Sequence, residues 1–304
     1  MQCLVTKLKE SATNDNLLKL GEIAIKFKKI GNNNADKHKM VFSSKNQVKL
    51  KIRGDGYFTD QNMIENQGTT LDGPTTTEIK TIYISDSDCE VIISNKHELT
   101  YLYVNSEAIC SSLIDISLMQ ELKYLSLNNS NITGPIKHLS TFKKLEGLYL
   151  ENTKTYGDLK DLAQLSRLTT ITISGGDITG NVESLSGLTK LKDIKLKYIN
   201  VHGDLSCLSD QLYFFSNFGG EGLFSWETER KEDANIIAME KVKLGDDVDK
   251  MLINQAKCKI GYTDSGNIWN KTIQVYGNRT SASNKAVETL KSKGYTIIVN
   301  DVTL

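Results

Sequence analysis

LKYLSLNNSNITGPIKHLSTFKK (122–144) is followed directly by LEGLYLENTKTYGDLKDLAQLSR (145–167), and the two stretches share one 23-residue pattern. Copies of this pattern begin at Leu99, Leu122, Leu145, Leu168 and Leu191. Internal similarity at a fixed period of this length is typical of a solenoid, in which each unit is too small to bury its own apolar side chains and stacks on its neighbours.

The apolar residues of each copy recur at fixed positions. Leucine or isoleucine at positions 1, 4 and 6 predicts a short strand with these side chains inward, as at Leu145, Leu148 and Leu150. Because the chain passes through every unit in the same sense, we expect these strands to form a parallel sheet. Apolar residues at positions 15 and 18, such as Leu159 and Leu162, return to the core from the opposite, convex side.

A glycine occupies position 13 of four copies, at Gly134, Gly157, Gly180 and Gly203. A glycine repeated at one turn position indicates a backbone that takes a positive φ or that approaches its neighbour closely. The pattern leaves both explanations open.

The pattern L-x-x-L-x-L-x4-I-T-G-x-I-x2-L-x2-L-x2 resembles the plant-type leucine-rich repeat, with one residue fewer where that class has its proline. The resemblance covers residues 99–211 and implies an α/β fold, a leucine-rich repeat solenoid with a parallel β-sheet. Where the family has a ladder of buried asparagines, this chain has Glu107, Ser130, Thr153, Gly176 and Ile199. We therefore expect at most a partial ladder, and the family's curvature is not assumed.

Residues 1–95 are predicted to form a small all-β domain in front of the repeats. Alternating apolar and polar residues indicate strands at 21–30, 46–54, 78–85 and 90–94, with turns at 31–39, 54–56 and 71–74. We interpret them as an antiparallel sheet or sandwich. The spacing of Ile79, Ile82 and Ile84 imitates a degenerate leading repeat. The domain either caps the end of the solenoid or carries a partner surface of its own.

The solenoid is predicted to span 96–304, with regular repeats at 99–211 and irregular units at 212–304. Phenylalanines and Trp226 crowd into 211–226, which we interpret as an irregular unit that covers a break in the stack, and 227–235 is a charged, solvated connection. Further β-α units follow, with strands at 241–244, 271–277 and 295–300 and helices at 245–258 and 281–294.

The composition excludes some classes of partner. The chain has 37 basic and 37 acidic residues, so nothing favours nucleic acid or an anionic membrane surface. No apolar run is long enough to cross a membrane, and the first residues lack the apolar segment of a secretory signal. The cytoplasm is therefore the default localisation. The five cysteines have no close pairing and are interpreted as structural thiols.

Catalytic chemistry has no recognisable pattern in this chain. The four histidines are scattered, and no nucleophile or phosphate-binding motif is present. Asp246, Asp247 and Asp249 lie at a predicted helix start, where acidic residues are expected without a metal. We therefore predict a non-enzymatic protein with no cofactor and no metal site.

The remaining candidate surface is the outward face of the parallel strands, at positions 3 and 5. Tyrosines gather there in the first three copies and charged residues in the fifth, so the predicted binding residues are Tyr101, Tyr103, Tyr124, Tyr149, Lys195 and Tyr198. Tyrosine combines a large apolar ring with a hydroxyl and is enriched at contact surfaces, although an exposed strand face also tolerates it. The predicted partner is a protein, with a glycan as the second choice.

A second hypothesis is a structural role in a larger assembly. The start and end of the chain are similar to repeat proteins of gut anaerobes, some of them phage-derived. This resemblance implies a bacterial or phage origin and a component of a phage-derived or cell-surface particle, in which the β-domain docks and the solenoid points outward. Particle association would distinguish it from the recognition module.

Overall fold

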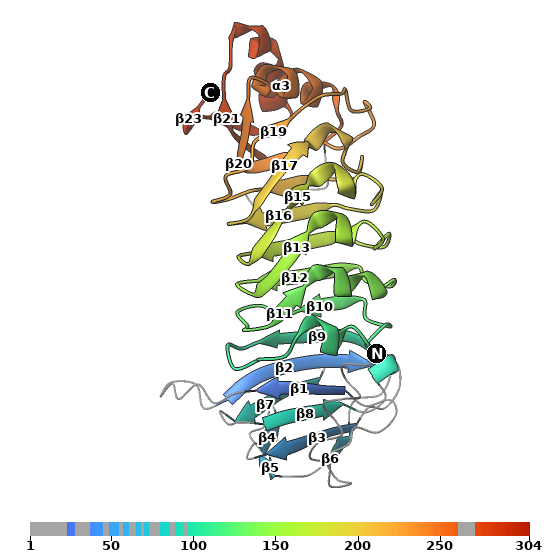
Figure 1. The fold of residues 1–304 in the computed structure, drawn as a ribbon. Helices are drawn as coiled ribbons and strands as arrows, with labels where there is room; N and C mark the ends of the chain where they lie inside the picture. Colours follow the sequence, from blue (N-terminus) through green and yellow to red (C-terminus); the bar gives the residue numbers. More distant parts are fainter. Residues whose placement is uncertain are drawn as a thin grey trace.

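The computed structural model describes residues 23–27, 37–44, 49–54, 57–60, 65–67, 70–72, 80–85, 89–93, 96–260 and 271–304. The 23-residue copies stack on one another (Figure 1). Their first strands pair in parallel with Tyr101, Tyr124, Gly147, Thr170 and Asp193 in register, which confirms the predicted parallel sheet. These strands are β9 (Leu99–Asn105), β10 (Tyr124–Ser126), β12 (Gly147–Glu151), β14 (Thr170–Ser174) and β16 (Asp193–Lys197).

The core of the stack consists of the residues at the repeated apolar positions. The inward leucines and isoleucines are fully buried, for example Leu145, Leu148 and Leu150. The chain returns on the side of the core opposite these strands through short helical turns whose apolar residues, such as Leu159 and Leu162, are also fully buried. These turns are η2 (Lys96–Glu98) before the stack, then α2 (Leu113–Ile116), η3 (Ile136–Thr141), η4 (Leu159–Leu162), η5 (Val182–Leu185) and η6 (Leu205–Cys207).

A second parallel sheet, which the sequence analysis missed, joins the strands to these turns. Its order is β11-β13-β15-β17-β19, and every pair is parallel. The strands are β11 (Thr133–Pro135), β13 (Lys154–Asp158), β15 (Asp177–Asn181), β17 (Asn200–Asp204) and β19 (Phe224–Ser225).

The repeated glycine lies in this second sheet, and both explanations for it hold. Gly180 has a φ of 121°, and a Cβ atom there would lie 2.6 Å from Asp158 Oδ1 and 3.0 Å from the backbone nitrogen of Leu159. Gly134, Gly157 and Gly203 also have positive φ. The residue after each glycine begins the helical turn, and three of them, Asp158, Asn181 and Asp204, accept a backbone hydrogen bond at 2.8–2.9 Å as N-caps.

The N-terminal strands form two antiparallel arrangements, as predicted. One is a separate sheet in the order β1-β8-β3-β6, from β1 (Ile23–Phe27), β8 (Cys89–Ile93), β3 (Lys49–Gly54) and β6 (Thr70–Asp72). The other continues the main sheet beyond β9 in the order β2-β7-β4-β5, from β2 (Lys37–Ser44), β7 (Lys80–Ser85), β4 (Tyr57–Asp60) and β5 (Glu65–Gln67). Ile25, Met40 and Val91 belong to the same buried cluster as Leu102.

Three predictions for this region were wrong. The predicted turn at 71–74 overlaps β6, because Leu71 and Asp72 pair with β3. The predicted turn at 31–39 overlaps β2, which begins at Lys37 and pairs antiparallel with β9. The segment thought to be a degenerate leading repeat is β7, which pairs with β2 and β4 rather than stacking on β9. Ile79 and the turn residues 31–36, 55–56 and 73–74 lie outside the described residues. The domain boundary near residue 95 stays a prediction, and β2 pairs with β9 across it.

Beyond the regular copies the main sheet continues in parallel, as predicted, through β18 (Phe214–Ser216), β20 (Ala238–Gly245), β21 (Thr272–Gly277) and β22 (Thr296–Val299). The antiparallel strand β23 (Val302–Thr303) ends it. Both predicted helices are present, as α3 (Val248–Lys257) and as η8 (Ser281–Ser283) followed by α4 (Asn284–Ser292).

The connection at 227–235 is not wholly solvated, contrary to prediction. Arg230 is 5% exposed, and its guanidinium donates to the carbonyl oxygens of Leu208 and Ser209, each at 2.8 Å. A buried arginine that meets main-chain carbonyls fixes this connection onto the end of the last regular copy.

Candidate binding face

Four of the predicted residues meet on the outward face of the main sheet. On neighbouring strands, Tyr124 lies between Tyr101 and Gly147, and Ser126 lies between Tyr103 and Tyr149. One row therefore runs Tyr101, Tyr124, Gly147 and the other runs Tyr103, Ser126, Tyr149, so each row has two tyrosines and one small residue. We call Tyr101, Tyr103, Tyr124 and Tyr149 the tyrosine cluster.

Rings of the cluster pack against one another and over Gly147. The ring centroids of Tyr101 and Tyr124 are 6.2 Å apart at an interplanar angle of 46°. A Cβ atom at Gly147 would lie 2.6 Å from the ring of Tyr124 and 3.1 Å from that of Tyr149, so both rings lean over the glycine. Ser126 is only 8% exposed. Ser126 and Gly147 are not among the predicted binding residues, although small residues at outward strand positions are a signal that the sequence carries.

The hydroxyl groups of the cluster are partly engaged. Tyr124 donates to Glu146 Oε2 at 3.3 Å, and Asn105 Nδ2 donates to the Tyr103 hydroxyl oxygen at 3.2 Å. Burial raises the pKa of Tyr101, and the neighbouring Tyr103 and Tyr149 add to this. Burial also raises the pKa of Tyr124, with Glu146 as the next cause. Both phenols therefore stay neutral at physiological pH and can donate hydrogen bonds.

Lys195 lies on the same face but apart from the cluster. The strand β14 separates it from Tyr149, which places the two strands about 10 Å apart at ordinary strand spacing. Its ammonium group pairs with Asp193 Oδ2 at 3.1 Å and lies 5.4 Å from the centroid of the Phe214 ring. Burial raises the pKa of Asp193, and Lys195 opposes this effect. Much of the charge of Lys195 is therefore already compensated within the chain.

Tyr198 lies off this face, in the turn that follows β16. Its backbone has a φ of 56°, and its side chain is 58% exposed. Its ring meets Phe218 edge-on, with centroids 5.5 Å apart. The structure thus brings the four tyrosines of the cluster together and places Lys195 and Tyr198 elsewhere.

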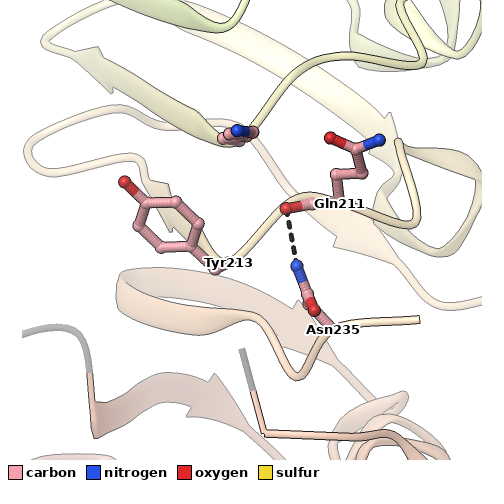
Figure 2. A pocket seen from close by; sticks show the side chains of 4 residues that line it. Gln211, Tyr213 and Asn235 are labelled. Carbon is pink, nitrogen blue, oxygen red and sulfur yellow. Dashed lines mark hydrogen bonds between the residues drawn. The ribbon is translucent and has the colours of Figure 1, made fainter. Parts of the chain in front are cut away.

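A polar pocket of about 460 Å³ opens where β16 and β18 begin. Lys192, Gln211, Tyr213 and Asn235 line it, and the Asn235 amide donates to the main-chain carbonyl of Gln211 at 2.8 Å (Figure 2). None of the predicted site residues lines this pocket. Its position coincides with a change in period, because Leu212 follows Leu191 after 21 residues rather than 23.

The acidic residues at the start of α3 have structural partners. Asp247 Oδ2 accepts from the backbone nitrogen of Trp226 at 2.9 Å, and Asp249 accepts from Thr280 and Ser283. Over the described ranges, no group of three or more His, Cys, Asp or Glu side chains is arranged to hold a metal ion. The cysteines at 89, 110, 207 and 258 are free thiols, and Cys3 lies outside the described residues.

The helices of the described segments are all too short or too polar to traverse a lipid bilayer.

The chain has distant likenesses among solved structures. The LRR ectodomain of the receptor kinase SOBIR1 from Arabidopsis thaliana matches with 24% identity and a TM-score of 0.34, over 40% of this chain and 73% of that one. The PEPR1-AtPEP1 structure matches with 12% identity and a TM-score of 0.42, over 66% of this chain and 35% of that one. Internalin C2 from Listeria monocytogenes matches with 14% identity and a TM-score of 0.29, over 42% of this chain and 75% of that one.

These likenesses are too distant to transfer a ligand or a role to this chain. No protein-family model and no curated protein sequence matches it.

Proposed function

We propose that the chain is a leucine-rich repeat solenoid that works as a non-enzymatic recognition module and binds a protein segment through the outward strand face. The tyrosine cluster forms the centre of the binding surface, Lys195 lies toward its margin on the same face, and Tyr198 lies off this face in the turn after β16. The single observation that supports this proposal is the grouping of four tyrosines on three neighbouring strands, with Tyr124 and Tyr149 leaning over Gly147 and Tyr101 against Tyr124.

The packing favours binding over simple tolerance of tyrosine on a strand face. Rings that lean on one another and over a glycine lose little further side-chain entropy when a partner covers them. Tyr124 is still 38% exposed, so apolar surface remains for a ligand to bury. The hydroxyl groups of Tyr124 beside Glu146 and of Tyr103 beside Asn105 offer hydrogen bonds to a peptide backbone.

The test is selection of a random peptide library displayed on phage against the full chain. We expect enriched peptides that bind the Tyr101→Ala/Tyr124→Ala variant at least about tenfold more weakly, because tyrosines at a binding centre commonly contribute about 1–2 kcal/mol each. The matched control is Tyr156→Ala, since Tyr156 is 49% exposed but lies on β13 in the second sheet. Binding should be unchanged in this variant.

Gly147→Ala gives a second, subtler probe. The added methyl group collides with the rings of Tyr124 and Tyr149 and should disturb the cluster while all four tyrosines remain. The site would be refuted if Tyr156→Ala weakened binding of the peptides as much as Tyr101→Ala/Tyr124→Ala does. It would also be refuted if the double alanine variant bound the peptides as tightly as the wild type. Enrichment of no peptide, together with assembly of the chain into large particles in light scattering, would favour the structural role instead.

A further inference from the structure

The turn at position 8 of the repeat takes a left-handed backbone conformation in successive copies. Its φ is 49° at Asn129, 55° at Asn152, 72° at Gly175, 56° at Tyr198 and 70° at Gly219. Glycine and asparagine adopt this conformation readily, whereas a bulky side chain does so at an energetic cost. Tyr198 is therefore the exception in this series, and stability of the turn does not explain its presence.

Contacts with the next unit hold Tyr198 in this conformation. Its backbone nitrogen donates to the carbonyl oxygen of Phe218 at 2.9 Å, and its ring packs over Gly219, where a Cβ atom would lie only 2.4 Å from two ring carbons. The ring also meets Phe218 edge-on. A largely exposed aromatic ring is thus fixed in position before any ligand arrives.

A lysine completes this group on the following strand. Lys241 Nζ lies 4.6 Å from the centroid of the Phe218 ring, and Lys241 itself has a φ of 54°. We call Tyr198, Phe218 and Lys241 the rim cluster. Lys197 precedes Tyr198, and within the described part of the chain no carboxylate pairs with Lys197 or Lys241. The nearby Lys243, by contrast, pairs with Glu221 at 2.8 Å. The rim cluster therefore has uncompensated positive charge.

The same turns in earlier copies satisfy their polar groups internally. Asn129 Nδ2 donates to Asn105 Oδ1 at 3.2 Å, Asn152 Nδ2 donates to Asn129 Oδ1 at 2.7 Å, and Ser174 donates to Asn152 Oδ1 at 3.1 Å. This ladder ends before Tyr198. At this position Tyr198 presents an aromatic ring in place of a paired amide, next to Phe218 of the following unit.

We propose that the rim cluster is a second binding site, which takes an acidic peptide segment carrying an aromatic side chain. The aromatic side chain of the ligand packs against Tyr198 and Phe218, and its carboxylates face Lys241 and Lys197. Paired aromatic rings favour an aromatic ligand group, and unpaired lysines select for negative charge. The site is separate from the tyrosine cluster, because Tyr198 and Phe218 lie in the turns after β16 and β18, and Lys241 lies on β20, four strands along the main sheet from β12.

The test measures fluorescence anisotropy of the labelled peptide Glu-Glu-Trp-Glu-Glu with the full chain. We expect it to bind at least tenfold more tightly than Lys-Lys-Trp-Lys-Lys and Glu-Glu-Ala-Glu-Glu, with affinity that falls as salt is added. Lys241→Gln should weaken the binding of the acidic peptides only. The Tyr101→Ala/Tyr124→Ala variant should bind as the wild type does, which separates this site from the proposed strand-face function.

Tyr198→Asn is the decisive variant. Asparagine suits the left-handed turn, as Asn129 and Asn152 show, so this variant should melt at a higher temperature and yet lose at least tenfold in affinity for the acidic tryptophan peptide. A purely structural tyrosine would give a lower melting temperature. Unchanged affinity in Tyr198→Asn would overturn the proposal, as would tighter binding of an oligogalacturonate than of the peptide.

Discussion

The regular copies between Leu122 and Leu208 and the irregular unit from Leu212 to Asn235 occupy adjacent places in one sheet but are stabilised differently. In the regular copies the sixth position is an apolar side chain at full burial, as at Leu127, Leu150 and Leu196. In the irregular unit this position is Asn217, which is 2% exposed, and neither of its amide atoms has a hydrogen-bond partner among the described residues.

Specific side-chain contacts, one within the unit and one with α3, replace the repeated pattern in the irregular unit. Phe215 and Phe224 meet edge-on at 5.2 Å, and Trp226 Nε1 donates to Asn254 Oδ1 of α3 at 3.0 Å. The packing of a regular copy is therefore specified by its own repeat sequence, whereas the packing of the irregular unit also depends on contacts with its neighbours. The departures from the repeat lie next to the rim cluster and the pocket lined by Gln211, Tyr213 and Asn235.

The largest expected effect comes from breaking a regular copy at its glycine. Gly180→Ala should lower the free energy of unfolding by about 3 kcal/mol, because alanine is strained at a φ of 121° and its methyl group would meet the Leu159 backbone nitrogen at 3.0 Å. Urea denaturation followed by circular dichroism measures this loss.

Gly187→Ala is the control for this substitution. Gly187 belongs to the same copy, but a Cβ atom there would meet nothing within 4 Å. The free energy of unfolding of the Gly187→Ala variant should stay within about 0.5 kcal/mol of the wild-type value. Equal effects of the two alanines would show that the stacking geometry described for position 13 is wrong.

The next effect has the opposite sign and tests the irregular unit. Asn217→Leu restores the repeat pattern and removes a buried, unpartnered amide, so it should raise the free energy of unfolding by about 2 kcal/mol. Asn128→Leu is the control, since Asn128 Oδ1 accepts from the backbone nitrogen of Glu151 at 3.0 Å, and its loss should destabilise the chain. Destabilisation by Asn217→Leu would mean that the unit cannot accommodate a regular side chain.

The sequence predicted the fold wherever the signal was periodic. The inward leucines, the parallel strands and both C-terminal helices could be identified because each depends on residues a few positions apart. The second sheet could not, because strands as short as Thr133–Pro135 carry too few alternating residues for detection. Arg230 was missed because a charged run is usually solvated, and only its contacts with Leu208 and Ser209 reveal its burial.

The candidate site likewise has features that the sequence predicts and features that only the structure reveals. Strand alternation was enough to place the four tyrosines on one face. It could not show that Tyr198 turns away from that face, because this follows from a left-handed φ in the turn. Strand alternation also could not show that Asp193 compensates the charge of Lys195. It could not show that Phe218 and Lys241 lie next to Tyr198, because these contacts join neighbouring units.

The smallest expected effect concerns Cys207, at the boundary between the two regions. Burial raises the pKa of its thiol to about 11, and Asp204 and Glu183 contribute further. The folded pKa lies above the unfolded value of about 8.5, so the stability linked to this thiol is complete below about pH 8.5 and is lost as the pH rises toward 11.

Alkylation of the native chain with iodoacetamide at pH 8, followed by mass spectrometry, measures this effect. Cys207 should react roughly 20-fold more slowly than glutathione, because the low thiolate fraction outweighs the greater nucleophilicity of a high-pKa thiolate. Asp204→Asn keeps an N-cap side chain but removes a negative charge, so it should speed the reaction. Unfolding in guanidinium should abolish the difference. Rapid alkylation in the native chain would show that the irregular unit does not cover Cys207 at the end of the last regular copy. The boundary described between the two regions would then be wrong.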